Sequence, residues 1–229
     1  MKETKKIRVK VKKRKLKVKN IMLCMLYIIL IVNFIYCIIN IKIKNIYIIN
    51  NNIVSDKEII NDANISNYPS YLLSFSYKLK KDILKNNYIK DVEIRKDKFK
   101  IYIYINEYKP LVIYNNKILL ENNTLVDNIH DIKGLPIVIS NNIDTLELSS
   151  SFLKVNKDIL LKISQIEYVP LENDLDRYLL YMNDGNSVYI KLSQIKKLNN
   201  YSKIVSSMKG KNGIIELDTD KDNISIKLK

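Results

Sequence analysis

Beyond residue 41 the chain contains no cysteine, because both of its cysteines, Cys24 and Cys37, lie in one apolar run near the N-terminus. The longer part of the chain therefore cannot form a disulfide framework, a cysteine nucleophile or a cysteine-ligated zinc site. Histidine is nearly absent as well. The single one, His130, lies in a polar stretch, 127–131, and we interpret it as a solvated loop residue.

Glycine is also scarce, with four in 229 residues, and the motifs that depend on it are missing. The sequence has no Gly-x-Ser-x-Gly elbow, no Walker A loop, no Gly-x-Gly-x-x-Gly and no His-Glu-x-x-His. A Ser-His-Asp triad around His130 and a Ser/Lys dyad stay open by residue count, but no spacing points to either. The sequence therefore predicts a binding protein and not an enzyme, with no catalytic residue, no cofactor, no metal ion and no small-molecule substrate.

The net charge of +15 is concentrated at the N-terminus. Residues 1–19 hold eleven basic residues and one acid, Glu3, whereas the other 210 residues carry 28 basic and 23 acidic side chains. A nucleic-acid partner would require a basic face on the folded part of the chain, so the local charge predicts no nucleic-acid binding there. For the tail itself, contact with anionic lipid or with nucleic acid stays an alternative to a plain role as a topology signal.

Residues 21–41 form a run of 21 residues without a charge. As a helix the run would span about 31 Å, which matches the roughly 30 Å hydrocarbon core of a bilayer. A buried core helix and a signal peptide are the alternatives. The run is too long for a signal peptide, and residues 35–38 offer no small-x-small cleavage site. We therefore expect an uncleaved transmembrane helix with the lipid bilayer as a partner.

The orientation of this helix follows from the charges on either side of it. Basic residues close to a membrane span stay on the cytoplasmic side, and only Lys42 and Lys44 flank the far end of the run. The sequence predicts a single-pass protein with the N-terminus in the cytoplasm and the bulk of the chain outside.

Residues 42–110 show the pattern strand, helix, helix, strand, strand. Within it, the spacing Ser55-x-x-Glu58 is a capping box, in which the Ser55 hydroxyl accepts from the Glu58 N–H and the Glu58 carboxylate from the Ser55 N–H. The helix that Ser55 starts should end near Ala63. The other predicted elements are a strand around 46–49, a helix over 76–86 with Leu79, Ile83 and Leu84 on one face, and strands at 92–95 and 99–106 joined by a turn at 96–98.

From Leu111 onward the strands are frequent and the turn signals close together, which predicts a mostly β domain. The predicted elements here are a helix over 151–165, a hairpin over 179–190 with its turn at 184–186, an amphipathic segment over 193–208, and two final strands at 213–217 and 224–228. We expect a domain of this size to support the smaller preceding one, whose core is small for independent stability.

The last strand is the predicted partner-binding element. Its apolar residues Ile224, Ile226 and Leu228 alternate with polar ones, so they should face the core. A chain-terminal strand tends to lie at a sheet edge, where free N–H and C=O groups can pair with another chain. We therefore expect a partner to bind at Ile224, Ser225, Ile226, Lys227 and Leu228. Lys227 and Lys229 on the outer face would equally repel unwanted strands, so both interpretations stay open.

Several motifs in this order resemble the FtsQ/DivIB family of bacterial cell-division proteins. Residues 46–59 match the opening of its POTRA domain, I-x-V-x-G-N-x-x-V-S-x-x-E-I, with Asn50 in place of the glycine. Asparagine tolerates the positive φ angle that such a turn requires. Residues 89–96 match V-x-x-a-x-V-x-R, and 101–110 match I-x-V-x-E-x-x-P, although the proline usual between these motifs is absent. The later motifs at 119–126, with Asn123 for glycine, at 134–137, at 179–190 and at 213–218 are also similar to the family's.

The resemblance implies an α+β fold with a single N-terminal transmembrane helix, a POTRA domain of order β-α-α-β-β and a mostly β second domain. The implied boundaries are 1–20 for a cytoplasmic basic tail, 21–41 for the helix, 42–110 for the POTRA domain and 111–229 for the β domain. The implied role is a non-enzymatic scaffold of the division septum. It would bind the small bitopic proteins FtsL and FtsB or DivIC, the latter through the C-terminal β region, and help organise septal peptidoglycan synthesis. A POTRA-containing factor of polypeptide export or envelope assembly is the alternative.

Overall fold

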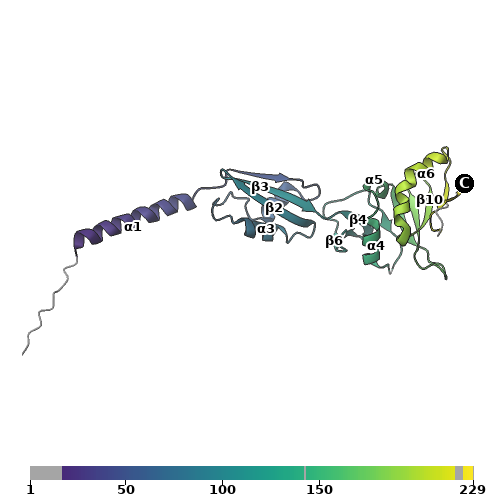
Figure 1. Ribbon diagram of the computed structural model, residues 1–229, viewed down its shortest axis with the longest axis horizontal. Helices are drawn as coiled ribbons and strands as arrows, with labels where there is room; N and C mark the ends of the chain where they lie inside the picture. The colour runs from purple at the N-terminus through teal and green to yellow at the C-terminus, as the bar shows by residue number, and fades with distance from the viewer. Residues whose placement is uncertain (1–16, 142, 220–223, 229) are drawn as a thin grey trace, which may run out of the picture.

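The computed structural model describes residues 17–141, 143–219 and 224–228. A long helix extends away from two sheet-containing units that follow one another along the molecule (Figure 1). The helix, α1, runs from Val18 to Ile39 and buries none of its residues. In the described ranges it is the one helix long and apolar enough to cross a membrane. It begins and ends slightly earlier than the predicted run 21–41, and most of the basic tail, 1–16, lies outside the described residues.

The first unit is a three-stranded sheet with two helices. Its strands are β1 (Asn45–Ile49), β2 (Ile89–Asp97) and β3 (Lys100–Glu107), and its helices are α2 (Asp56–Asp62) and α3 (Ser76–Ile83). The spatial order is β1-β3-β2, with β1 parallel and β2 antiparallel to β3. The predicted order of strand, helix, helix, strand, strand is confirmed. On β3 the alternation of apolar residues places Ile101, Ile103 and Ile105 in the core.

Two local predictions for this unit are wrong. The helix predicted over 76–86 ends at Ile83, and Leu84 is exposed. The turn predicted at 96–98 lies instead at Lys98 and Phe99, which both have positive φ angles, 44° and 66°. Two successive residues with positive φ are typical of the tight hairpin turn whose twist matches that of the strands. β2 therefore extends to Asp97, which pairs with Lys100.

Two asparagines stand where a turn requires a positive φ angle. Asn50, directly after β1, has φ 68°, and Asn123, between the later strands β5 (Lys117–Leu120) and β6 (Leu125–Asp127), has φ 63°. Asparagine reaches this conformation more readily than other residues that carry a Cβ. The prediction that asparagine can replace glycine in the first of these turns is confirmed.

The second unit is a nine-stranded mixed sheet of order β12-β11-β10-β9-β8-β7-β4-β5-β6. Its strands are β4 (Pro110–Tyr114), β5 (Lys117–Leu120), β6 (Leu125–Asp127), β7 (Ile137–Val138), β8 (Ile163–Tyr168), β9 (Arg177–Met182), β10 (Ser187–Lys191), β11 (Gly213–Glu216) and β12 (Ser225–Leu228). Its helices are α4 (Thr145–Phe152), α5 (Lys157–Leu160), the 3₁₀ helix η1 (Leu192–Asn200) and α6 (Tyr201–Ser207). With the apolar helix and the first unit, this gives the expected α+β fold.

The helix predicted over 151–165 is wrong. α4 starts earlier, because the Asp144 side chain accepts hydrogen bonds from the N–H groups of Leu146 and Glu147, and it ends at Phe152. The short helix α5 follows, and Ile163 already begins β8. The segment 193–208, predicted only as amphipathic, forms the 3₁₀ helix η1 followed by α6.

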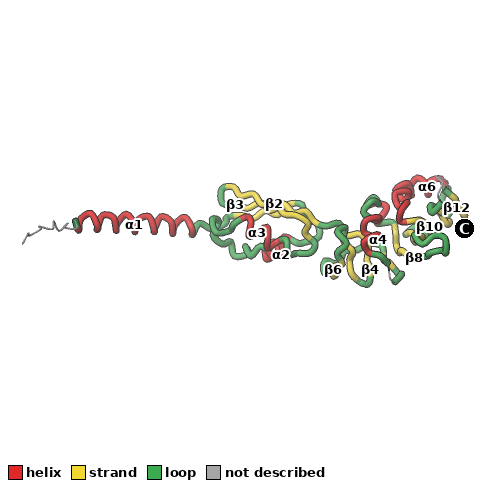
Figure 2. The backbone as a smooth tube through the Cα atoms, turned by 60° about the horizontal axis from the view of Figure 1, so that its bottom comes forward, coloured by secondary structure: helices red, strands yellow, loops and turns green. Residues whose placement is uncertain are grey.

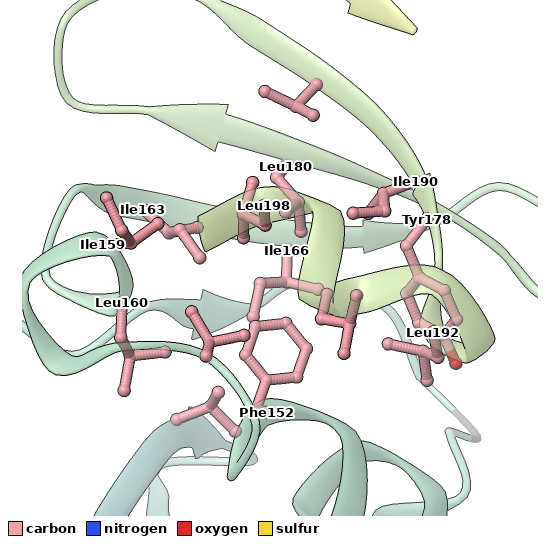
Figure 3. Packing of buried hydrophobic residues seen from close by; sticks show 14 of the residues in the cluster. Phe152, Ile159, Leu160, Ile163, Ile166, Tyr178, Leu180, Ile190, Leu192 and Leu198 are labelled. Atoms are coloured by element: carbon pink, nitrogen blue, oxygen red, sulfur yellow. The ribbon is translucent and has the colours of Figure 1, made fainter. Parts of the chain in front are cut away.

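The core of the second unit lies between its sheet and its helices. Figure 3 shows Phe152 of α4 among side chains from α5, β8, β9, β10 and η1. Phe152, Ile166, Leu180, Ile190 and Leu198 are almost completely buried. Figure 2 shows α4 beside β4 and α6 beside β10.

The two units share one strand, β5. Its central residue Leu119 belongs to the core of the second unit, whereas Ile118 and Leu120, which point to the opposite face, belong to the core of the first. Hydrogen bonds add to this contact. The Tyr88 hydroxyl donates to the Asp127 carbonyl at 2.7 Å, and Lys90 Nζ donates to Glu121 Oε1 at 2.8 Å. The junction between the units is therefore a packed interface.

Candidate partner-binding edge of the sheet

Strand β12 lies at one edge of the nine-stranded sheet in the part of the chain that the structure describes. It pairs antiparallel with β11, with Gly213 opposite Leu228 and Glu216 opposite Ser225. Because β12 has one neighbour here, part of its N–H and C=O groups point away from the sheet. The predicted edge position of the segment that holds Ser225, Ile226, Lys227 and Leu228 is thus what the structure shows.

The side chains of this segment do not all face the core, as the sequence predicted. Ile226 is half-buried, lies opposite Ile215 and packs against the core of the second unit. Ile224 and Leu228, by contrast, are 47% and 52% exposed. The prediction was wrong for these two because alternation places a side chain on a face of the sheet but does not tell whether another element covers that face.

A shallow groove of about 250 Å³ lies beside the exposed apolar residues. It runs between the end of α6 and β12, and it is lined by Ser207, Met208, Lys209, Lys211, Ile226 and Leu228. Met208 and Ile226 give it an apolar floor, and the exposed Lys209 and Lys211 place positive charge at its rim. No sequence pattern indicated this groove, since its two sides come from segments that are separated along the chain.

The charges on the outer strands are partly paired. Lys227 Nζ lies 2.6 Å from Glu216 Oε1 across the β11–β12 pair. The hydrogen bond from Lys227 lowers the pKa of Glu216, and the same bond raises the pKa of Lys227. The ion pair therefore holds the exposed side chain of Lys227 against β11. Lys229, the second basic residue expected on this face, lies outside the described residues.

A buried polar network fixes the start of β11 to the turn before β10 and to α6. The N–H of Gly213 donates to Asn186 Oδ1 at 2.8 Å, and Asn186 Nδ2 donates to the Tyr201 hydroxyl at 3.0 Å. The Tyr201 hydroxyl in turn donates to the Asp184 carboxylate, at 2.7 and 2.8 Å to its two oxygens. Burial, followed by this bond to Asp184, raises the pKa of Tyr201. Asn186 was predicted only as part of a turn, and no pattern in the sequence indicated its partners.

Ser55 and Glu58, the predicted structural cap, form half of a capping box. Ser55 Oγ accepts from the Glu58 N–H at 3.3 Å. The carboxylate of Glu58 does not return to the Ser55 N–H but accepts from Asn86 Nδ2 at 2.9 Å. The predicted bond from the Ser55 N–H to the Glu58 carboxylate is therefore wrong. It was inferred from local spacing, whereas Asn86, which lies 28 residues after Glu58, takes up the carboxylate instead.

His130 is not the solvated loop residue that the sequence indicated. Its side chain is 13% exposed and its Nε2 lies 3.8 Å from Glu58 Oε1. Its ring packs edge-on against Tyr88, with 4.7 Å between the ring centroids. Polar neighbours in the sequence made the segment look exposed, but the packing of the first unit against the second encloses it.

Glu107 has a structural role that sequence reasoning missed. Its carboxylate accepts hydrogen bonds from the backbone N–H groups of Asn52, Ile53 and Val54, at 2.8 to 3.0 Å. The end of β3 is thereby fixed to the loop between β1 and α2. The only signal was the position of Glu107 in the motif I-x-V-x-E-x-x-P, which gave no role for it.

Comparison with known proteins agrees with this architecture. Residues 41–108 match the family model of the POTRA domain, FtsQ-type. Together with the N-terminal apolar helix and the mixed second sheet, this match defines a membrane-anchored POTRA protein of the FtsQ type. The chain is 31% identical over 192 residues to the cell division protein DivIB of Bacillus subtilis, covering 77% of this chain and 72% of that protein. The chain belongs to the DivIB family of cell division proteins.

Other relatives carry the same description. The cell division protein DivIB of Bacillus anthracis is 28% identical over 188 residues, which cover 77% of this chain and 71% of the relative. A solved structure, the major extracytoplasmic domain of DivIB from Geobacillus stearothermophilus, is 23% identical and matches with a TM-score of 0.38, covering 45% of this chain and 96% of that one. The family membership makes this chain a component of the bacterial division machinery.

Proposed function

We propose that this protein is a non-enzymatic scaffold of the divisome. It binds small bitopic division proteins of the FtsL and FtsB or DivIC type, and helps to organise septal peptidoglycan synthesis. The observation that carries the proposal is the open edge of the second sheet, where β12 presents unpaired backbone groups beside the exposed side chains of Ile224 and Leu228. Addition of a partner strand to such an edge needs no catalytic residue and no cofactor, because main-chain hydrogen bonds supply the affinity.

The chemistry of the edge favours one kind of partner segment. Lys209 and Lys211 rim the groove next to β12, and Lys227 is exposed on the strand itself. An extended segment that alternates apolar and acidic residues would place its apolar side chains beside Leu228 and its carboxylates near these lysines. Such a segment complements both the shape and the charge of the edge.

Removing β12 tests this proposal. Deletion of residues 224–229, or Ser225→Pro, which removes one amide donor from the strand, should reduce co-purification of the FtsB- or DivIC-like partner to background. The first unit should stay folded, because its core contains no residue of β12. Leu175→Ala, in an exposed loop of the same unit, serves as the matched control. Wild-type recovery of the partner with either β12 variant would assign binding to another surface.

The localisation proposal has the N-terminus in the cytoplasm, the bulk of the chain outside and the protein at the division septum. It rests on the basic residues before α1 and on the name of the relatives. Alkaline phosphatase fused after the last residue should be active, and fused after Lys19 it should be inactive. A fluorescent fusion should form a band at midcell in dividing cells. Inverted phosphatase activities would refute the topology, and a uniform membrane signal would favour export or envelope assembly.

A further inference from the structure

The loop between α2 and α3 carries an exposed apolar surface that the scaffold role leaves unexplained. We name residues 68–77, which lead into α3 and include its first two residues, the α2–α3 loop. Of its large apolar side chains, Phe75 is 61% and Tyr77 79% exposed, and Tyr68, Leu72 and Leu73 are exposed as well. Contiguous exposed apolar side chains are uncommon on a water-facing surface and mark a site of contact with another apolar phase or molecule.

The position of this loop is fixed by hydrogen bonds to the chain that leaves α1. The N–H of Tyr71 donates to the Ile41 carbonyl at 2.8 Å, and the N–H of Ile43 donates to the Pro69 carbonyl at 3.0 Å. The Ser70 hydroxyl donates to the carbonyl of Ile39, the last residue of α1. The loop is thus bonded to the end of α1 and to the residues that follow it, so it lies beside the point where the chain leaves that helix (Figure 1).

The first unit holds the loop in this conformation from the inside. Lys96 Nζ donates to the Tyr71 carbonyl at 2.5 Å and to the Ser74 carbonyl at 2.8 Å. Its ammonium group also lies over the Tyr71 ring, 4.3 Å from the centroid, and that ring packs edge-on against Phe99. Tyr71 and Ser74 therefore point inward, which leaves Leu72, Leu73 and Phe75 on the outside. The apolar surface is a built feature of the fold.

The charges around the loop identify the apolar phase. Between Asp62 and Asp82 the chain has no acidic residue, whereas Lys78 and Lys81 follow the loop and are exposed. Lys42 and Lys44, directly after α1, are exposed as well. Aromatic side chains concentrate at the level of the lipid headgroups, and lysines near the surface are attracted to anionic lipid. An apolar surface with tyrosines and a basic border, attached to the end of a membrane helix, has the chemistry of a bilayer-binding site.

We propose that the α2–α3 loop is a second membrane contact, in which Leu72, Leu73 and Phe75 enter the headgroup region of an anionic bilayer. The contact adds to the α1 anchor and docks the first unit against the membrane surface. It does not depend on which side of the membrane the unit occupies, because the loop is bonded to α1 whatever its orientation.

The absence of tryptophan from the chain gives a direct test. Full-length Phe75→Trp is reconstituted into vesicles of phosphatidylcholine and phosphatidylglycerol with brominated acyl chains. The bromine atoms quench the fluorescence of an indole ring that has entered the bilayer. Phe34→Trp in α1 is the membrane-embedded reference, and Leu175→Trp, in an exposed loop of the second unit, is the water-exposed reference. The indole at 75 should emit at shorter wavelength than that at 175, and its quenching should approach that of the indole at 34.

Two further measurements separate lipid from protein as the bound partner. Adding Leu72→Gln and Leu73→Gln to Phe75→Trp should remove most of the quenching at 75, with circular dichroism confirming that the fold is retained. Omitting phosphatidylglycerol should weaken quenching at 75 more than at 34. Quenching of Phe75→Trp no greater than that of Leu175→Trp would overturn the proposal. Such a result, with the emission of Phe75→Trp shifting only when a partner protein is added, would assign the loop to protein binding.

Discussion

Gly213→Ala is expected to detach β12 from the sheet while the rest of the protein stays folded. A Cβ atom at this position would stand 2.5 Å from the Lys227 carbonyl oxygen and 3.2 Å from Leu228 Cα. Both are backbone atoms of the neighbouring strand, so they cannot move aside as the end of a side chain does. The last strand would have to leave its register, and partner co-purification should fall as far as it does when β12 is deleted.

Hydrogen exchange of the full-length protein in detergent measures this detachment directly. In Gly213→Ala the amides of β12 should lose their protection, whereas those of β2 and β3 should keep it. Lys227→Ala is the matched control, since it removes an exposed ion pair to Glu216, which contributes little at a solvated surface, without introducing a clash. Unchanged protection of β12 in Gly213→Ala would show that the sheet accommodates the methyl group. Partner binding should then stay at the wild-type level.

Glu107→Ala should produce the largest loss of stability among single changes in the polar residues of the first unit. Three backbone N–H groups, those of Asn52, Ile53 and Val54, would lose their carboxylate acceptor. Hydrogen bonds to a charged acceptor contribute about 1.5–3 kcal/mol each. Water can hydrogen-bond to part of this loop once the carboxylate is gone, so the net cost is smaller than the sum of the three bonds. We expect a net loss of about 3 kcal/mol in the free energy of unfolding, measured by urea unfolding of the full-length protein in detergent.

Two neighbouring changes calibrate that value. Ser55→Ala removes the cap of α2 and should cost about 0.5–2 kcal/mol, the usual range for a lost cap. Glu93→Ala removes an exposed carboxylate that pairs with Arg95 at 2.7 Å and should change the free energy of unfolding little, because water screens such a pair. A Glu107→Ala variant no less stable than Glu93→Ala would contradict the role given to the carboxylate.

Sequence patterns predicted those features that depend on a few adjacent residues. Ser55 caps α2 because the hydroxyl and the Glu58 N–H are three residues apart. Asn50 reaches a positive φ angle because its own side chain tolerates it. The alternation of β3 and the turn around Gly185 were recognised for the same reason, since strand and hairpin signals are local.

The features that were missed depend on residues far apart along the chain. A helix was predicted over 151–165, but Ile163 and Ile166 belong to β8 and face the core from that strand. His130 is enclosed by Tyr88 and Glu58, which belong to the first unit. Leu228 was predicted as buried because its strand alternates, but no described element covers that end of the sheet. Local propensity gives the face of a residue, and only tertiary packing gives its burial.

The division of β5 between two cores has a mechanical consequence. Swinging the second unit about the junction would pull either Leu119 or Ile118 and Leu120 out of an apolar environment, and each buried aliphatic side chain resists this by about 1.5–3 kcal/mol. The two units therefore move together as one stiff rod and not as two domains joined by a flexible linker. A stiff rod keeps its far end at a set height above its base, and it transmits a push or a tilt at one end to the other.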